Sequence, residues 1–246
     1  MISIITVVLN MKDGLERTVR SVAGQTYSDI EFVVIDGGST DGTLDLIKKY
    51  EDKISYWSNE KDEGIYDAMN KGLRKAKGDY VWFLNAGDEI YAPGTLERIL
   101  AMGEADAYYG EIEYVDETGK SFGTRTLKKP PENLSWKNFI EGMVVGHQGI
   151  IMKRECAVEY NPEYKHCADI DWAIRSFKKC GKALNTHLIL AKFLIGGYSK
   201  RNITRSNKER YRILREHFPF WKVWMVHVKL GARFLRYYFS HKKRLY

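Results

Sequence analysis

The sequence has little cysteine. Three cysteines stand among its 246 residues, with no Cys-x-x-Cys pair and no cysteine and histidine spacing typical of a zinc site. An odd count without such spacing argues against a disulfide framework and against a structural zinc centre. The simpler assumption is a protein of a reducing compartment.

A signal peptide is also missing. The first ten residues, MISIITVVLN, are mostly apolar but have no positively charged start, and Lys12 and Asp13 end the apolar run too early for a signal peptide. We therefore expect a β-strand that opens a domain. With 246 residues and 44% hydrophobic content, the chain suits one large domain or a domain with an appendage.

Acidic residues are nearly absent from the C-terminal end. Residues 200–246 contain 14 Lys and Arg but only 2 Asp and Glu, which leaves 25 basic and 30 acidic residues in the first 199. The net charge of +7 is therefore local to the tail. An acidic body with a basic, aromatic tail indicates contact with an anionic surface at one end, and we expect no nucleic-acid partner.

Apolar runs alternate with helical patterns through the first hundred residues. Strands are expected at residues 2–9, 30–36, 54–58 and 80–84, and helices at 13–24, 42–50 and 64–77. Strands that are apolar on both faces and separated by helices indicate an α/β fold with a mostly parallel sheet covered on both sides. Ligands of such sheets bind beyond the carboxyl ends of the strands, where Asn10, Asp36 and the segment 85–88 stand.

The pattern loosens from about residue 104. Residues 105–124 predict a hairpin around DETGK, and helical sequence resumes at 132–140. We expect one domain over residues 1–200, with halves at 1–103 and 104–200 that form two walls of a cleft. A helical tail follows at 201–246.

The string VIDGGSTDGT (34–43) places Asp36 at a strand end and Asp41 where it can cap the next helix. It is neither a dinucleotide fingerprint nor a P-loop. Two interpretations stay open: an ordinary capped turn, or an Asp that accepts hydrogen bonds from a base or ribose. Similarly, Asp67 and Lys71 form a favourable i, i+4 pair on the next helix, whose polar side also carries Asn70 and whose apolar stripe begins at Ile65.

Four strings, read in order, carry a family resemblance. TVVLN, QTYSDIEFVVIDGGSTDGT, EKDEGIYDAMNKG and GDYVWFLNAGDE resemble family 2 glycosyltransferases of the GT-A fold, which is Rossmann-like, and in particular those that assemble bacterial capsule, O-antigen and exopolysaccharide. Two later strings, GHQGIIMKRE and CADIDWAIRSF, resemble acceptor-side elements of that family. The resemblance covers about 180 residues and leaves out the tail, and it makes residues 1–103 the nucleotide-sugar half and 104–200 the acceptor half.

The resemblance implies a role for each matched residue. Asp169 matches the general base of inverting members, while His147 and Asp171 fall on the acceptor side. From the residues alone, one of Asp169 and Asp171 could equally be a helix cap and the other exposed. The implied nucleotide-sugar residues are Thr6, Asn10, Asp36, Asp62, Asp67 and Asn85. Arg201 is added from the residues themselves, because GGYSKRN (196–202) predicts a flexible, cationic loop suited to closing over the diphosphate, with a plain turn before a helix as the alternative.

A metal motif is only partly present. NAGD (85–88) matches the family's DxD-type motif, but Asn85 and Gly87 stand where many relatives have Asp. Asp88 is the carboxylate expected to hold Mn²⁺ or Mg²⁺, which would neutralise the departing diphosphate. Capping of the next helix is the alternative role of Asp88.

The tail predicts an interfacial helix. Lys222, Lys229, Arg233 and Arg236 share a narrow helical stripe, and Trp, Phe, Val, Leu and Tyr occupy the rest. Four cations would cost about 2.5–3.5 kcal/mol each at a bilayer centre, so a spanning helix is not expected. A helix lying on anionic lipid fits better; a core-packing helix with a basic tip is the alternative.

Together these patterns predict an inverting glycosyltransferase at the cytoplasmic face of the plasma membrane. It would use a nucleotide sugar, UDP-linked, and a lipid-linked saccharide acceptor. A sugar-nucleotide nucleotidyltransferase is less consistent because VVLNMKDGLERT lacks the glycine-rich loop that such enzymes use. A non-catalytic membrane-associated subunit that retains the fold is a third interpretation, kept open by the reduced NAGD motif.

Overall fold

A single mixed sheet organises the chain. The computed structural model describes residues 1–126, 128–195 and 203–240. The strands are β1 (Ile2–Val8), β2 (Ile30–Asp36), β3 (Tyr56–Asn59), β4 (Tyr80–Phe83), β5 (Glu89–Ile90), β6 (Ala107–Val115), β7 (Ile150–Lys153) and β8 (Ala183–Leu194). They form one eight-stranded sheet in the order β3-β2-β1-β4-β7-β6-β8-β5.

The sheet changes direction between its two halves. β3, β2, β1 and β4 are all parallel, with Ile2 opposite Ile30 and also opposite Tyr80. β7 then runs antiparallel to β4 and to β6, whereas β6 and β8 are parallel. The predicted α/β fold with a mostly parallel sheet is confirmed, and β4 next to β7 is where the parallel arrangement ends.

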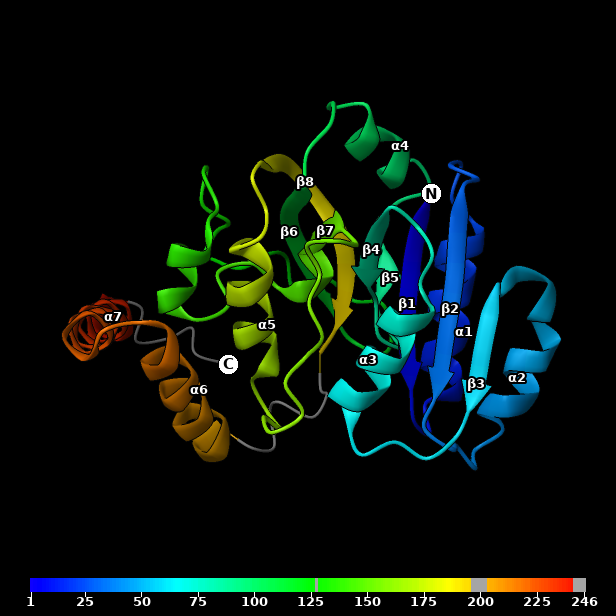
Figure 1. Cartoon of the computed structure of the whole chain (residues 1–246), viewed down its shortest axis with the longest axis horizontal. Helices are drawn as coiled ribbons and strands as arrows, with labels where there is room; N and C mark the ends of the chain where they lie inside the picture. The colour runs from blue at the N-terminus through cyan, green and yellow to red at the C-terminus, as the bar shows by residue number, and fades with distance from the viewer. Residues whose placement is uncertain (127, 196–202, 241–246) are drawn as a thin grey trace.

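Helices cover both faces of the sheet, as expected (Figure 1). The helices are α1 (Lys12–Ala23), α2 (Thr43–Lys49), α3 (Ile65–Lys75), α4 (Thr95–Leu100), α5 (Ala168–Phe177), α6 (Ile203–His217) and α7 (Phe220–Ser240), with short 3₁₀ turns η1 (Glu51–Lys53), η2 (Trp136–Glu141) and η3 (His147–Gly149). One core contains apolar side chains of α1, α2 and α4; the other contains those of α3 and α5. Alternate residues of β1 and β2 therefore contribute to two separate cores.

The second half differs from its sequence prediction in two places. The expected hairpin around residues 116–120 is a turn closed by one isolated bridge between Val115 and Ser121. The return segment pairs only briefly, through backbone hydrogen bonds of Tyr114 with Phe122 and Gly123, while β7 pairs with the first residues of β6, Ala107 to Tyr109, and β8 pairs along its other edge. The helical sequence at 132–140 becomes the 3₁₀ turn η2.

The stripe assignment on α3 was wrong at two positions. Ile65, expected to face the core, is 42% exposed. Asn70, expected on the polar side, is buried, donates to the Tyr160 carbonyl at 2.8 Å and accepts from the Tyr160 N–H at 2.6 Å. This amide joins the first half of the chain to the second, a role that helical periodicity does not reveal.

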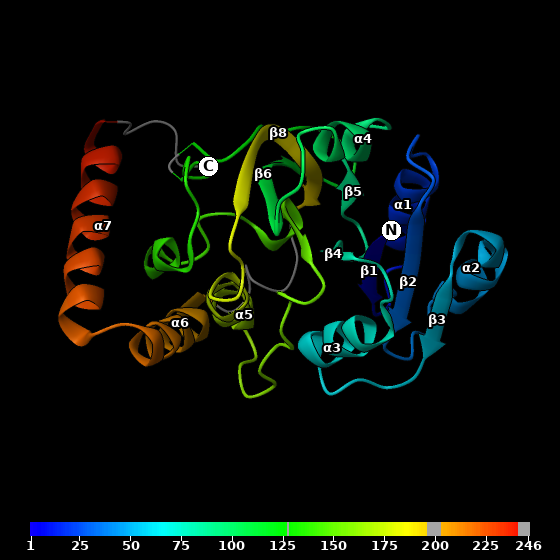
Figure 2. The same cartoon turned by 45° about the horizontal axis from the view of Figure 1, so that its top comes forward.

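The tail forms two helices at one end of the molecule. Figures 1 and 2 show α6 next to α5, with α7 as the outermost element, opposite the end formed by α2 and β3. Among the helices in the described part of the chain, none is both long and apolar enough to cross a membrane. The division of the chain into functional halves stays a prediction.

Candidate functional site

Polar residues meet at the carboxyl ends of β1, β2 and β3. Asn10 follows β1, where its Oδ1 accepts the Thr40 N–H at 2.8 Å, and its own N–H donates to Ser39 Oγ at the same distance. Asp36 ends β2 and accepts from the Ser39 N–H at 3.1 Å and from Asn59 Nδ2 at 2.6 Å. The three strand ends thus form one connected polar edge, as parallel topology predicts.

The same bonds define what Asp36 can offer a ligand. Its Oδ1 is taken by Ser39 and its Oδ2 by Asn59, and its side chain is fully buried. In this geometry Asp36 orders the loop that follows it. Each carboxylate oxygen has further lone pairs, so contact with a base or ribose stays a prediction.

Asp62, just before α3, and Asp67, in the first turn of α3, both pair with the side chain of Lys71. Lys71 Nζ lies 2.7 Å from Asp62 Oδ1 and 3.5 Å from Asp67 Oδ2, which confirms the expected i, i+4 pair. Burial raises the pKa of Asp62, and Lys71 opposes this shift. A Cβ on Gly37 would lie 2.8 Å from Asp62 Oδ2, so the loop after β2 approaches Asp62 closely because residue 37 has no side chain.

Thr6 occupies a structural position. Its hydroxyl is fully buried and donates to the Leu84 carbonyl at 2.6 Å, which joins β1 to the end of β4. It can act on a nucleotide only through the backbone that it supports. Arg201 lies outside the described residues, and its expected contact with the donor is a prediction.

The NAGD segment forms a closed hydrogen-bond network. Asp88 Oδ2 accepts from Gln148 Nε2 at 3.0 Å and from the Asn85 N–H at 3.2 Å, while Oδ1 accepts from the Leu194 N–H at 3.3 Å. Asp88 is 3% exposed, and burial raises its pKa to about 7. The carboxylate joins the loop after β4 to η3 and to the end of β8.

These contacts test the fit of a divalent cation. Both oxygens of Asp88 already have protein partners, whereas Asn85 Oδ1 is buried and has no hydrogen-bond partner. Within residues 1–126, 128–195 and 203–240, no group of three His, Cys, Asp or Glu could hold a metal ion. The described residues therefore do not form a metal site by themselves, and Asp88 as a metal ligand stays a prediction.

Asp169 lies in the first turn of α5, beside a group of aromatic rings. Tyr66 stacks on Tyr160 at a centroid distance of 5.3 Å, and Tyr160 stacks on Trp172 at 5.2 Å. Burial raises the pKa of Asp169 to about 6, against a smaller opposing contribution from the Ile170 N–H, which donates at 3.1 Å. Burial and the nearby charge of Asp169 raise the pKa of Tyr66 and Tyr160 well above normal. The carboxylate is therefore a stronger base than an ordinary aspartate.

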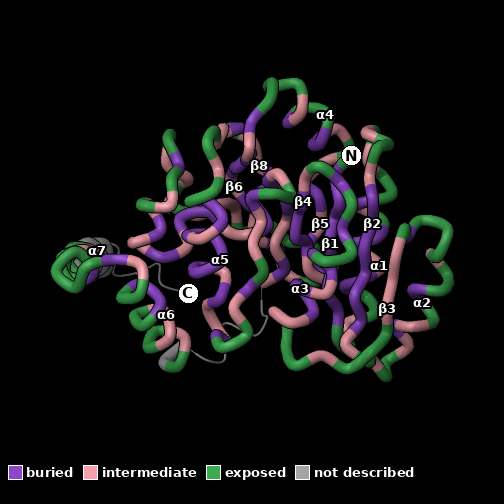
Figure 3. The backbone as a smooth tube through the Cα atoms, in the orientation of Figure 1, coloured by how far each residue is buried: buried purple, intermediate pink, exposed green. Residues whose placement is uncertain are grey.

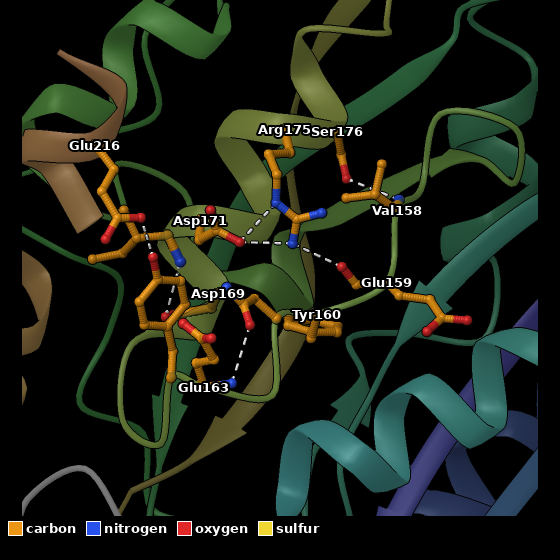
Figure 4. Close-up of polar contacts among 12 residues, drawn as sticks. Val158, Glu159, Tyr160, Glu163, Asp169, Asp171, Arg175, Ser176 and Glu216 are labelled. Atoms are coloured by element: carbon orange, nitrogen blue, oxygen red, sulfur yellow. Dashed lines mark hydrogen bonds and ion pairs between the residues drawn. The ribbon is translucent and has the colours of Figure 1, made fainter. Parts of the chain in front are cut away.

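Asp171 faces away from Asp169, toward α6. Its Oδ2 lies 2.6 Å from Arg175 Nη2, and its Oδ1 lies 2.8 Å from His217 Nε2; Figure 4 shows the Arg175 contact and the bond from Arg175 to the Glu159 carbonyl. Burial alone would raise the pKa of Asp171, but His217 and Arg175 together lower it. The alternative in which one of the two carboxylates is exposed was wrong, and Asp171 as an acceptor contact stays a prediction.

His147 is enclosed in η3. Burial lowers its pKa to about 4, with a further contribution from the charge of Arg125, so its imidazole is neutral at physiological pH. Its Nε2 has no hydrogen-bond partner. Arg125, whose charge also lowers the pKa of Asp169, is held by Tyr114 and by the Met143 carbonyl at 2.7 Å. No sequence pattern predicted this cation near Asp169.

Glu209 of α6 is the second residue that sequence reasoning missed. Its carboxylate accepts three consecutive backbone N–H groups, from Lys165 at 2.9 Å, His166 at 2.7 Å and Cys167 at 2.6 Å. These residues directly precede α5 and its Asp169. Glu216, further along the same helix, forms a hydrogen bond with Tyr164 (Figure 4). The tail thus holds the loop that leads into α5 and Asp169.

The comparisons with known proteins agree with one another on the family. The model of glycosyl transferase family 2 matches residues 3–159. A glycosyltransferase of PGL/p-HBAD biosynthesis from Mycobacterium bovis is 33% identical over 224 residues, covering 85% of this chain and 83% of its own. The teichuronic acid biosynthesis glycosyltransferase TuaG of Bacillus subtilis, itself described as putative, is 25% identical and covers 88% of each chain.

Solved structures share the fold. S. aureus TarS 1-349 in complex with UDP-GlcNAc superimposes with a TM-score of 0.68 at 18% identity, covering 86% of this chain and 65% of that one. The mannosyltransferase PcManGT of Pyrobaculum calidifontis, in complex with GDP-Man and Mn²⁺, gives 0.62 at 17% identity, covering 94% and 74%. This chain therefore spans about two thirds of the TarS fragment.

Proposed function

Because this chain belongs to glycosyl transferase family 2 and is a glycosyltransferase, we propose that it transfers a sugar from a UDP-linked donor to a lipid-linked saccharide, with inversion at the anomeric carbon. The product would belong to a cell-surface polysaccharide. Support for the donor comes from TarS, which was solved with UDP and with UDP-GlcNAc. Support for the product comes from relatives that serve PGL/p-HBAD and teichuronic acid biosynthesis.

The observation that carries the proposal is the environment of Asp169. A carboxyl whose pKa is raised to about 6 is largely ionised at neutral pH yet accepts a proton more readily than an exposed aspartate. In the proposed step Asp169 takes the proton of the acceptor hydroxyl as its oxygen attacks the anomeric carbon. The bond from that carbon to the diphosphate breaks, and the nucleoside diphosphate leaves with the bonding electrons.

The donor would lie along the polar edge formed by Asn10, Asp36 and Asp62. Asn85, whose side-chain oxygen is buried without a partner, is the described residue best suited to a new contact there. Mn²⁺ or Mg²⁺ remains the expected cofactor, on the analogy of PcManGT, and would enter with the donor's diphosphate. No step above depends on it, because the described residues do not form its site.

The acceptor and the location belong to the same proposal. A lipid-linked saccharide is presented at a membrane, and the basic, aromatic tail suits an anionic surface. Free cysteines, Cys156, Cys167 and Cys180, are consistent with a reducing compartment. We place the enzyme at the cytoplasmic face of the plasma membrane.

A thermal-shift panel tests the donor. Nucleoside diphosphates and nucleotide sugars are added with Mn²⁺, with Mg²⁺ and with EDTA, because a ligand of the native state raises the melting temperature. We expect a shift with uridine nucleotides. No shift with any nucleotide, on folded protein, would overturn the donor assignment and favour a non-catalytic subunit. A shift that survives EDTA would remove the cation from the proposal.

Asp169→Asn tests the base. The amide keeps the shape of the side chain but cannot take a proton, so we expect turnover to fall by roughly 10²- to 10⁴-fold while the uridine nucleotide shift is retained. Release of nucleoside diphosphate in the presence of a membrane lipid extract is the measurement. Asp45→Asn on the exposed surface of α2 is the matched control. Normal turnover by folded Asp169→Asn would exclude this residue as base.

A further inference from the structure

α7 presents an apolar face that no described part of the chain covers. Its exposed large side chains are Phe220 (53%), Trp221 (55%), Trp224 (57%), Met225 (49%) and Val228 (53%). Exposed apolar residues are ordinary when scattered, but a contiguous group marks an interaction site. We propose that this face of α7 docks the enzyme on an anionic lipid bilayer, a partner that rests on the proposed lipid-linked acceptor.

The opposite side of α7 is fixed to the body of the protein. Val223 is fully buried in the core that also contains α5 and η2. Just before the helix, Phe218 stacks on Trp136 at a centroid distance of 5.5 Å. His227 packs edge-on against Tyr211 of α6, with ring centroids 6.0 Å apart. Because these contacts fix the rotation of α7 about its axis, its apolar face must point outward.

The cations of α7 border that apolar face on one side. At about 100° per residue, with Phe220 at the origin, the five apolar residues span about 140° of the helix. Lys222, Lys229 and Arg236 then fall at about 160–200°, and all three are exposed. Around the helix, the side that packs on the body of the protein is therefore followed by the apolar face and then by the cationic edge. This is the arrangement of an interfacial helix whose long cations reach lipid headgroups.

The acidic residues of the tail do not oppose this charge. α7 contains none in Phe220–Ser240. The acids of α6 are Glu209 and Glu216, which bond the loop before α5 and Tyr164. The outward charge of α7 is consequently positive and complementary to anionic headgroups.

A second copy of the chain fits this face less well. Pairing two α7 faces would place Phe220, Trp221 and Trp224 together, but each copy would add Lys222, Lys229 and Arg236 with no acid on α7 to balance them. Anionic lipid supplies both the apolar layer and the counter-charge. Figure 3 shows α7 at one end of the molecule, with many of its described residues coloured as exposed, where a flat surface can reach it.

Vesicle co-sedimentation of the full chain tests the proposal. Phosphatidylcholine vesicles with and without phosphatidylglycerol are compared for the wild type and two variants. Trp221→Ser with Trp224→Ser should weaken binding by at least about tenfold. Lys222→Gln with Lys229→Gln and Arg236→Gln should weaken binding to anionic vesicles by about hundredfold.

Matched controls keep the test specific. Phe122→Ser removes an aromatic ring that is 55% exposed elsewhere, and Lys48→Gln with Lys77→Gln and Lys179→Gln removes three exposed cations from the body; both should bind like the wild type. Circular dichroism and melting temperature check that every variant folds.

Two results would overturn the proposal: wild-type protein that stays in the supernatant with anionic vesicles, or α7 variants that bind as well as the wild type. Light scattering without lipid identifies the competing partner, because a dimer that the tryptophan variant abolishes, with no vesicle binding, would assign the face to self-association. The uridine nucleotide shift, measured without lipid, reports separately on the proposed transferase function.

Discussion

Two carboxylates of the candidate site differ in what surrounds them. Asp88 is enclosed by three protein donors, from Gln148, Asn85 and Leu194. Within the described residues Asp169 accepts one hydrogen bond, from its neighbour Ile170, and otherwise lies near aromatic rings. Burial raises the pKa of both groups, but more of the lone pairs of Asp88 are committed to the fold than those of Asp169. At the scale of single residues, this difference separates a structural carboxylate from a candidate base.

The pH dependence of turnover follows from Asp169. Its pKa of about 6 means that the group becomes protonated below this pH and can no longer accept the acceptor's proton. We expect kcat/KM to fall about tenfold for each pH unit below the pKa, measured from pH 5 to 8 with the nucleotide shift as a control for binding. A flat profile down to pH 5 would contradict the assignment.

Removal of the Asp88 side chain should destabilise the protein. Asp88→Ala leaves the Leu194 and Asn85 N–H groups and the Gln148 amide without their acceptor, so we expect a loss of about 2–4 kcal/mol in the free energy of unfolding, with or without metal. Urea denaturation is the measurement, and Asp13→Ala, at an exposed site on α1, is the control. An unchanged unfolding midpoint would show that this network contributes little, and a cation role for Asp88 would then gain weight.

Titration of Asp88 also affects stability. The folded protein binds the Asp88 proton more tightly than the unfolded chain does, because its pKa is raised from 3.8 to about 7. This group therefore stabilises the fold most below pH 4, and its contribution is lost as pH rises through 7. Other groups add their own pH dependence. The contribution of Asp88 is therefore isolated by comparing the free energy of unfolding of the wild type with that of Asp88→Asn across the pH range.

At the scale of elements, α6 connects the tail to the loop before α5. Three backbone N–H groups of residues 165–167 converge on Glu209, and Cys167 Sγ contacts the Ser206 carbonyl at 3.3 Å. These contacts are made just before α5, which begins at Ala168 and carries Asp169 in its first turn. The surroundings of Asp169 therefore include a helix about 40 residues further along the chain.

Glu209→Gln should affect the base without affecting the donor. The amide accepts fewer of the three N–H bonds, and a small displacement of Asp169 should lower kcat by roughly tenfold to hundredfold. The charge of Glu209 also raises the pKa of Asp169, so the acid limb of the pH profile should move to lower pH in the variant. A purely structural role would not move that limb.

Glu216→Gln is the matched control. It removes a carboxylate from the same helix, bonded to Tyr164 rather than to the loop backbone, and should leave the acid limb in place. Equal effects of the two variants would contradict a specific role for Glu209.

At the scale of the whole molecule, local sequence determined the first half better than the second. β2 covers residues 30–36, as its apolar run predicted, and α1 and α3 lie within two residues of their expected bounds. These elements alternate at short range, so periodicity suffices. In the second half β6 pairs with β8, whose first residue, Ala183, lies far along the chain, and no local pattern indicates such a pairing.

The candidate site shows the same difference between residues that local motifs predict and residues that only long-range contacts bring in. Asn10 and Asp36 stand at the strand ends where the motifs put them, and Asp62 lies in the loop between β3 and α3. Gln148 and Glu209 were not predicted as partners because they lie 60 and 42 residues from Asp88 and Cys167. Their roles depend on tertiary contacts, which spacing along one sequence does not encode.

Deletion of residues 219–246 tests whether the tail belongs to the folded body. It removes fully buried Val223, and we expect the melting temperature to fall by at least roughly 5 °C. A chain that stops after Ser240 is the control and should melt like the wild type. If the deletion melts unchanged, α7 is only loosely attached, and the fixed rotation inferred for it would be wrong.

The absence of acidic residues from Phe220–Ser240 has a kinetic consequence. With no acid on α7, the cations of this helix form a field of one sign that extends about a Debye length, roughly 8 Å in physiological salt. Such a field accelerates encounter with an oppositely charged surface, whereas burial of apolar rings slows departure. Added salt should therefore reduce the rate at which the enzyme is captured far more than it shortens its residence, so recruitment would respond to ionic strength and headgroup charge while the bound enzyme stays in place through many turnovers.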